Sequence, residues 1–346
     1  MAKCPVVAET ISVSEMAELA SDRIFSVFGW ERHPLTNQNC DCVDKVRHRK
    51  QKKSKTHPTD CVFSYIDPYT GRDVFVNTDL KSYKGTTLEA ADVAKAVRNL
   101  GHSTECANRS EQWKNLFIGR ESNSEIIGML FIYNHDQDYD ANFSKRLVDL
   151  TPSTFEFLPE TFAGVVGPAH VCYLNSIAQD IKALHSDGKL PDKVDRSFFY
   201  PHLSRANAVH QHHKSATLQV LLSPLLVLCY EFPSDKQPKN AARRGVYAYY
   251  DGKGDSINEF KYLINYFFKY QLASEDTDIF VCCANPHPDA AVNFTNAKVG
   301  YAREYWPAHA GSEDDCKKQL ERIIYRNVSN FVMKFEVREL GLRWPE

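Results

Sequence analysis

The stretch of sequence that decides the fold runs from residue 57 to residue 81 and reads HPTDCVFSYIDPYTGRDVFVNTDLK. Residues 61–66 and 74–81 are rich in β-branched and aromatic side chains, and the segment between them contains Asp, Pro and Gly. Two such runs on either side of a cluster of turn-forming residues predict a β-hairpin.

The expected register of this hairpin brings charged side chains together. With the turn centred on Tyr69-Thr70, Asp60 lies opposite Asp79. Residues i and i+2 of a strand share a face, so Lys81 projects beside Asp79 while Leu80 points into the core. Directly opposed side chains have Cβ atoms about 4.5 to 5.5 Å apart, which lets two carboxylates share a metal ion.

Two carboxylates and a lysine in this arrangement suit the hydrolysis of a phosphodiester. That reaction needs a nucleophilic water, neutralisation of the phosphate charge and help for the leaving oxygen, all of which Mg²⁺ held by carboxylates can supply. A nearby lysine orients the water or stabilises developing negative charge. A bare Asp-x-Lys tripeptide is usually no more than an exposed strand face. The opposed Asp60 is what favours a metal site here.

An amphipathic helix is expected upstream of the hairpin, over residues 14–28, with Ser14 as its N-cap and Gly29 at its end. Together with this helix, His57-Pro58-Thr59-Asp60 and Asp79-Leu80-Lys81 resemble the PD-(D/E)xK nuclease superfamily, which includes restriction endonucleases and Holliday-junction resolvases. Ser14-x-x-x-Glu18 followed by Gly29-Trp30 is similar to the first helix of the resolvase-like branch, which often supplies an additional acid at the position of Glu18. Glu15, one turn earlier, is the alternative.

The resemblance covers residues 14–133 and departs from the family pattern at Thr59, which intervenes between Pro58 and Asp60. It implies an α/β fold of the restriction endonuclease type, with a mixed central sheet flanked by helices. It also implies that Asp60, Asp79 and Glu18 bind Mg²⁺ or Mn²⁺, with Lys81 beside the attacking water. The implied activity is that of a nuclease, and DNA is favoured over RNA as its substrate.

A basic run without any acidic residue precedes the hairpin, and counterion release makes such a run a sequence-independent contact for a phosphate backbone. The alternative is a solvated loop. The expected nucleic-acid-binding residues are Lys45, Arg47, Arg49, Lys50, Lys52, Lys53 and Lys55. The formal net charge of the chain is −2, so any surface that binds nucleic acid must be local.

The chain has 346 residues, which favours two domains. The nuclease-like domain is expected over 1–150, and a second α/β or α+β domain for substrate or partner binding over 151–346. In the first we expect a loop over 32–55, a helix over 88–100 and a strand over 126–133. In the second we expect strands over 171–174, 219–232, 246–250 and 279–284, and helices over 176–184 and 257–272.

The ten cysteines and the apolar segments indicate a soluble cytoplasmic protein with reduced thiols and no membrane span. Cys40-x-Cys42 with nearby histidines raises zinc as an alternative, but the motif lacks a second ligand pair at zinc-site spacing, which favours buried thiols. A nuclease domain fused to an unfamiliar second domain resembles bacterial anti-phage defence effectors that a protein partner restrains. A single site cuts one strand per event, so cleavage of both strands of a duplex would favour a homodimer. The rival function is a non-catalytic nuclease-like scaffold that binds a partner or nucleic acid.

Overall fold

The computed structural model describes residues 15–48, 55–83, 89–119, 123–134, 155, 157–201, 214–235, 237, 243–305 and 313–330. These residues fall into two compact units. The first draws on Met1–Asn175 and Ser215–Leu222, and the second on Ser176–Lys214 and Ser223–Phe331. The division therefore lies beyond the expected residue 150, because strand β7 (Ala163–Val166) pairs with β6 in the first sheet.

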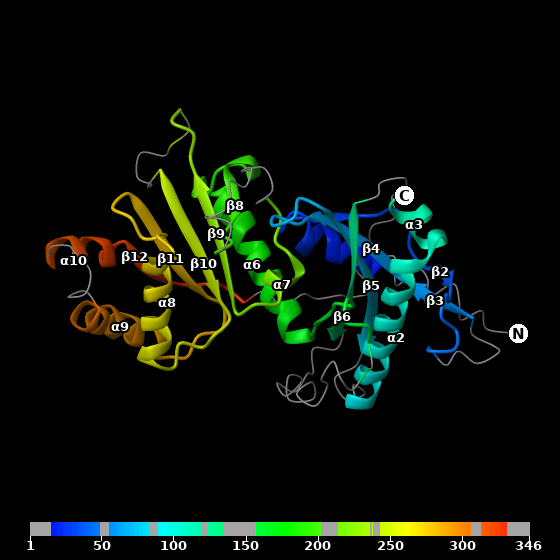
Figure 1. Cartoon of the computed structure of the whole chain (residues 1–346). Helices are drawn as coiled ribbons and strands as arrows, with labels where there is room; N and C mark the ends of the chain where they lie inside the picture. The colour runs from blue at the N-terminus through cyan, green and yellow to red at the C-terminus, as the bar shows by residue number, and fades with distance from the viewer. Residues whose placement is uncertain are drawn as a thin grey trace, which may run out of the picture. The chain divides into compact units, whose positions relative to one another are not determined.

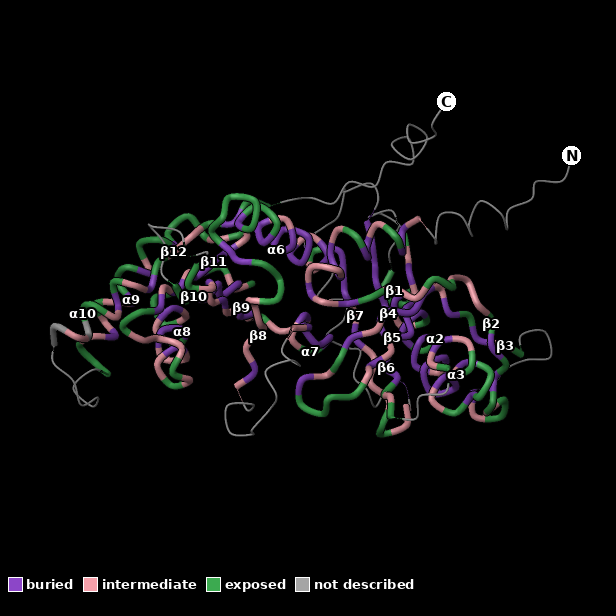
Figure 2. Tube along the Cα trace, turned by 90° about the horizontal axis from the view of Figure 1, so that it is seen from above, coloured by how far each residue is buried: buried purple, intermediate pink, exposed green. Residues whose placement is uncertain are grey.

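The first unit is built on a five-stranded mixed sheet in the order β1-β4-β5-β6-β7. Strands β1, β4 and β5 pair antiparallel, whereas β5, β6 and β7 pair parallel. This is the mixed central sheet that the sequence predicts, and its strands are largely buried (Figure 2). The remaining bounds are Glu31–Arg32 for β1, Cys61–Ile66 for β4, Asp73–Tyr83 for β5 and Ser124–Asn134 for β6.

The β4–β5 hairpin has the register expected from the sequence. Ile66 pairs with Asp73 and Cys61 pairs with Thr78, so the next residues outward are Asp60 and Asp79. The turn is held by the Asp67 side chain, whose Oδ1 accepts hydrogen bonds from the backbone N–H groups of the next turn residues. Such an Asx turn explains why this stretch closes a hairpin.

Helix α2 (Ala90–Arg109) covers one face of the sheet and runs beside β5 and β6 (Figure 1). Its Val93, Val97 and Leu100 pack with Leu130 of β6 in one apolar cluster. The helix extends beyond the expected end at residue 100 through Gly-His-Ser-Thr, a run with low helix propensity. Burial of this second half against the sheet outweighs that propensity.

The opposite face is covered by the upstream helix. Residues 15–20 are α-helical and continue into a π-helical turn, η1 (Ser21–Phe25). The Phe25 ring lies 4.9 Å from the ring of Phe63 on β4 and 5.9 Å from that of Phe131 on β6. Gly29, with φ of 84°, ends the segment as expected, because a left-handed conformation suits glycine.

Within the expected loop over 32–55, one short segment forms a strand of a small two-stranded sheet. Strand β2 (Gln38–Asp41) pairs antiparallel with β3 (Thr56–Thr59), and Cys40 faces His57 across the ladder. Neither four-residue strand alternates apolar and polar side chains clearly enough to be seen in the sequence. A short helix, α3 (Glu111–Phe117), follows α2. Its N-cap is Ser110, whose Oγ accepts a hydrogen bond from the Trp113 N–H.

The second unit is an α/β unit with a five-stranded sheet in the order β12-β11-β10-β9-β8. One face packs against α8 and α9 around Phe260, Phe267 and Phe294. On the other face, Tyr249 of β10 donates a hydrogen bond to Asp180 of α6. The bounds are Arg196–Phe198 (β8), Leu225–Glu231 (β9), Arg244–Tyr250 (β10), Thr277–Cys283 (β11), Ile323–Asn327 (β12), Pro168–Ser186 (α6), Ile257–Lys269 (α8), Ala290–Glu304 (α9) and Glu313–Glu321 (α10).

Two expectations for this part of the chain were wrong. Residues 171–174 belong to α6 rather than to a strand, because a four-residue apolar run fits a buried helix equally well. The strand expected over 219–232 is divided, since helix α7 (Leu218–Leu221) ends before Pro224 and β9 begins after it. None of the described helices is long and apolar enough to cross a membrane.

Candidate active site

The structure brings Asp60, Asp79 and Lys81 together at one end of the hairpin. Lys81 Nζ lies 2.5 Å from Asp79 Oδ1, and the two side chains are 37% and 18% exposed. Leu80 between them is buried on the opposite face, as its place in the strand requires. The ion pair is therefore open to solvent while its backbone is fixed inside the sheet.

Asp60 lies partly buried beside Asp79. Its Oδ2 accepts a hydrogen bond of 2.8 Å from the backbone N–H of Leu80. Burial, together with the charge of Asp79 and a hydrogen bond to it, raises the pKa of Asp60 to about 7, whereas Lys81 and the Leu80 N–H oppose this rise. Two carboxylates held this close bind a proton or a cation.

The donor set fits a hard divalent cation. Asp60 and Asp79 offer carboxylate oxygens, which Mg²⁺ and Mn²⁺ prefer. Among the residues that the structure describes, no arginine forms an ion pair with either of them. The Asp79 side chain is 18% exposed, so water reaches it. The chemistry of this pair of acids therefore fits a hard divalent cation.

A buried polar network behind the acids positions the hairpin, and sequence reasoning missed it. Thr59 Oγ1 donates to Asn77 Oδ1 at 2.9 Å and accepts from Trp113 Nε1 at 3.2 Å. Asn77 in turn donates to Ser103 and Thr104 of α2. Thr59, which departs from the family pattern in the sequence, is therefore the residue that ties the strand before Asp60 to the helices.

The backbone of Asp60 is held both by the partner strand of the hairpin and by a residue outside it. Its N–H donates to Thr78 O at 3.2 Å, and its C=O accepts from Asn37 N–H at 2.8 Å. Asn37 has φ of 53°, a left-handed conformation that asparagine tolerates better than most residues. The position of Asp60 is therefore fixed on both sides of its peptide.

Glu18 stands apart from this group in the part of the chain that the structure describes. It is exposed on the helical segment 15–20, whose continuation packs on the face of the sheet opposite to Asp60 and Asp79. No hydrogen bond or ion pair among the described residues joins Glu18 to either aspartate. Its role rests on the family resemblance.

Of the basic run, Lys45, Arg47 and Lys55 fall within the described residues, and both lysines are exposed. Arg47 pairs with the buried Glu105 at 2.5 Å, so much of its charge is already balanced inside the protein. The other expected nucleic-acid contacts lie outside the described residues: Arg49, Lys50, Lys52 and Lys53.

The mixed sheet with its flanking helices is the fold expected of a PD-(D/E)XK nuclease domain. Residues 7–160 match the family model described as the GAPS4 protein PD-(D/E)XK nuclease domain, which confirms the resemblance drawn from the sequence. No curated protein and no solved structure gives a significant match. The second unit lies outside the matched residues.

Proposed function

We propose that the first unit is a divalent-metal-dependent nuclease with its centre at Asp60, Asp79 and Lys81. The observation that supports this best is the close pair of carboxylates, in which burial and the charge of Asp79 penalise the ionised form of Asp60. A cation between them removes that penalty. Mg²⁺ or Mn²⁺ bound there supplies Lewis-acid stabilisation of the phosphate and an activated water.

The protein residues then have distinct tasks. Asp60 and Asp79 hold the ion, and the Leu80 N–H keeps the Asp60 carboxylate in place through its 2.8 Å hydrogen bond. The ion pair with Asp79 keeps the Lys81 ammonium beside the centre. From there Lys81 donates a hydrogen bond to the attacking water or to a phosphate oxygen. Glu18 is proposed as an auxiliary ligand or a water-orienting group, on the resemblance alone.

The substrate we propose is DNA, cut internally, with the basic run over 45–55 contacting the phosphate backbone. The matched family is associated with defence, which supports a role in a multi-component anti-phage system. In such a system the second unit would bind a restraining partner or select the substrate. A homodimer would place two centres on the two strands of a duplex.

The test compares cleavage of plasmid, linear duplex and RNA by the full chain, alone and with the product of a neighbouring gene, with and without Mg²⁺. We expect Mg²⁺-dependent cleavage that Asp79→Asn and Lys81→Met abolish. Asp73→Asn, at the other end of the same strand, is the matched acidic control. Lys114→Met is the basic control, because Lys114 is 37% exposed like Lys81 and also pairs with an acid.

Cleavage that survives in both Asp79→Asn and Lys81→Met would refute this assignment of the site. Because a partner can be required for activity, Mn²⁺ binding by calorimetry gives a second readout that needs no substrate. The proposal requires weaker binding in Asp60→Asn and Asp79→Asn than in wild type and Asp73→Asn. Equal binding in all four proteins, with no cleavage, would instead support the non-catalytic scaffold.

A further inference from the structure

Four side chains of the first unit, three of them from residues 42–57 and one from α2, converge in a buried cluster. They are Cys42, His48, His57 and Cys106, all of them buried. Cys42 and His48 flank the turn after β2, His57 lies on β3, and Cys106 lies on α2. One ligand atom from each of the four lies within 4.8 Å of all the others.

The distances within this cluster match a tetrahedral zinc site. A zinc ion with bonds of about 2.3 Å to sulfur and about 2.0 Å to nitrogen has ligand atoms about 3.8 Å apart for S–S, about 3.5 Å for S–N and about 3.3 Å for N–N. The two sulfurs are 3.8 Å apart. His48 Nδ1 is 3.4 Å from each sulfur and 3.3 Å from His57 Nε2.

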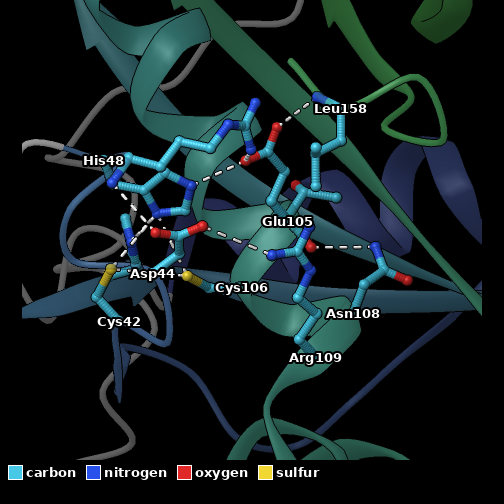
Figure 3. Close-up of polar contacts among 11 residues, drawn as sticks. Cys42, Asp44, His48, Glu105, Cys106, Asn108, Arg109 and Leu158 are labelled. Carbon is cyan, nitrogen blue, oxygen red and sulfur yellow. Dashed lines mark hydrogen bonds and ion pairs between the residues drawn. The ribbon is translucent and has the colours of Figure 1, made fainter. Parts of the chain in front are cut away.

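Hydrogen bonds alone do not account for these contacts. His48 Nε2 lies 2.8 Å from the buried Glu105 carboxylate, so this nitrogen carries the proton and Nδ1 presents its lone pair to the cluster (Figure 3). At that lone pair, two sulfurs and the His57 nitrogen crowd at hydrogen-bond distance. The one lone pair of Nδ1 cannot accept good hydrogen bonds from all three of these atoms. A cation at the centre of the cluster would instead bind all four ligand atoms at once.

The surroundings complete the pattern of a metal centre. One carboxylate oxygen of Glu105 holds the His48 ring. The other oxygen of Glu105 accepts a hydrogen bond of 2.8 Å from the Leu158 N–H. A carboxylate behind a ligating imidazole orients the ring and makes it a better donor. The backbone N–H groups of Val43 and Asp44 donate to Cys106 Sγ. Burial raises the pKa of the Cys106 thiol to about 11, and these two hydrogen bonds act against that rise.

We propose that Cys42, His48, His57 and Cys106 bind one structural Zn²⁺ ion. Two thiolates and two imidazoles are soft and borderline donors, which exclude Mg²⁺ and favour zinc among common cellular metals. All four protein ligands are present and buried, so the site is closed and structural rather than catalytic. The ion joins β3 and the turn after β2 to α2.

Three of the four zinc ligands lie in or close to the basic run in the sequence, and one of them is also close to Asp60. His48 and His57 bracket residues 49–56 of the basic run, so zinc fixes both ends of that segment. His57 also lies three residues before Asp60. The zinc site therefore supports the two parts of the domain on which the proposed function depends, although its own evidence is independent of that function.

The experiment measures metal in the full chain, purified without chelator or metal-affinity resin. Elemental analysis is expected to give one zinc per chain. Replacement by Co²⁺ should give the intense visible bands of tetrahedral cobalt and a thiolate charge-transfer band. Cys42→Ser and Cys106→Ser should lose the metal. Cys40→Ser is the matched control, because Cys40 is a buried cysteine two residues from Cys42 and outside the cluster.

His57→Cys keeps four ligands and should retain zinc where His57→Ala does not. If the cysteine variants fail to fold, the Co²⁺ spectrum of the wild-type chain still decides, because its charge-transfer band reports the thiolates directly. A wild-type chain without zinc that gives no tetrahedral cobalt bands overturns the proposal. So does a Cys42–Cys106 disulfide in unreduced peptide maps, or one iron per chain in place of zinc.

Discussion

Replacing Asp60 by asparagine measures the electrostatic penalty at the proposed centre when Mg²⁺ is absent. Burial and the neighbouring Asp79 raise the pKa of Asp60 from 3.8 to about 7, against the effects of Lys81 and the Leu80 N–H. An acid whose pKa is higher in the folded chain than in the unfolded chain destabilises the fold where it is ionised. This penalty therefore grows as the pH rises from about 4 to about 7 and is complete above that range.

The size of the effect follows from the shift. About three pH units correspond to about 4 kcal/mol at about 1.4 kcal/mol per unit. Side-chain and solvent rearrangement absorbs part of this, so we expect Asp60→Asn to raise the free energy of unfolding by about 2 kcal/mol at pH 8. At pH 5 the gain should be less than about half as large. Asparagine retains an oxygen for the 2.8 Å hydrogen bond from Leu80 N–H.

Urea unfolding followed by tryptophan fluorescence is a suitable assay, because Trp30 and Trp113 are both buried in the first unit. The protein is dialysed free of Mg²⁺ under conditions that retain zinc, and Asp73→Asn is the control. Adding Mg²⁺ at ten times its dissociation constant should stabilise the wild type by about 1.4 kcal/mol. The reasoning fails if Asp60→Asn is no more stable than wild type at pH 8, or if Mg²⁺ stabilises both equally.

Three further results are expected. Thr59→Val removes the hydrogen bonds to Asn77 Oδ1 and from Trp113 Nε1, and it should cost about 1 to 3 kcal/mol in urea unfolding. Thr59→Ser should restore most of this, and equal losses in the two variants would contradict the network. Gly128→Ala places a Cβ 2.7 Å from Thr104 Oγ1 and 3.2 Å from Leu100 Cγ, so we expect the free energy of unfolding to fall by about 1 to 3 kcal/mol. An unchanged urea midpoint would show instead that α2 shifts to make room for the added methyl group. The double variant Lys45→Gln and Lys55→Gln should reduce the slope of log affinity for duplex DNA against log salt concentration by about 2. An unaltered slope would show that these lysines do not contact the DNA phosphates.

The sequence predicted the hairpin well because its signals are local. The strand runs, the turn residues and the alternation of side chains all lie within the segment 57–81, and they determine which residues face each other. Gly29 and the buried aromatic residues of the upstream helix were equally visible. In the second unit, β10, β11 and α8 were predicted for the same reason.

The features that the sequence did not reveal depend on contacts between distant segments. Cys106 lies 49 positions beyond His57, so no ligand spacing links it to Cys42 and the histidines. The sequence near Cys42 contains no second ligand pair at zinc-site spacing, because α2 supplies the other cysteine. The Thr59–Asn77–Trp113 network is hidden similarly, since each residue alone resembles an ordinary polar or core position.

The two proposed metal centres are connected by one short strand. His57 would hold zinc, and Asp60, three residues later, would hold the catalytic ion. Mg²⁺ prefers carboxylate oxygens whereas zinc prefers thiolate and imidazole, so the two ions need not compete for one site. Between them Thr59 is buried and bonded to both Asn77 and Trp113, which leaves the strand little freedom. Zinc therefore sets the position of Asp60 without taking part in the reaction, and its removal should weaken the binding of Mg²⁺ before the domain unfolds.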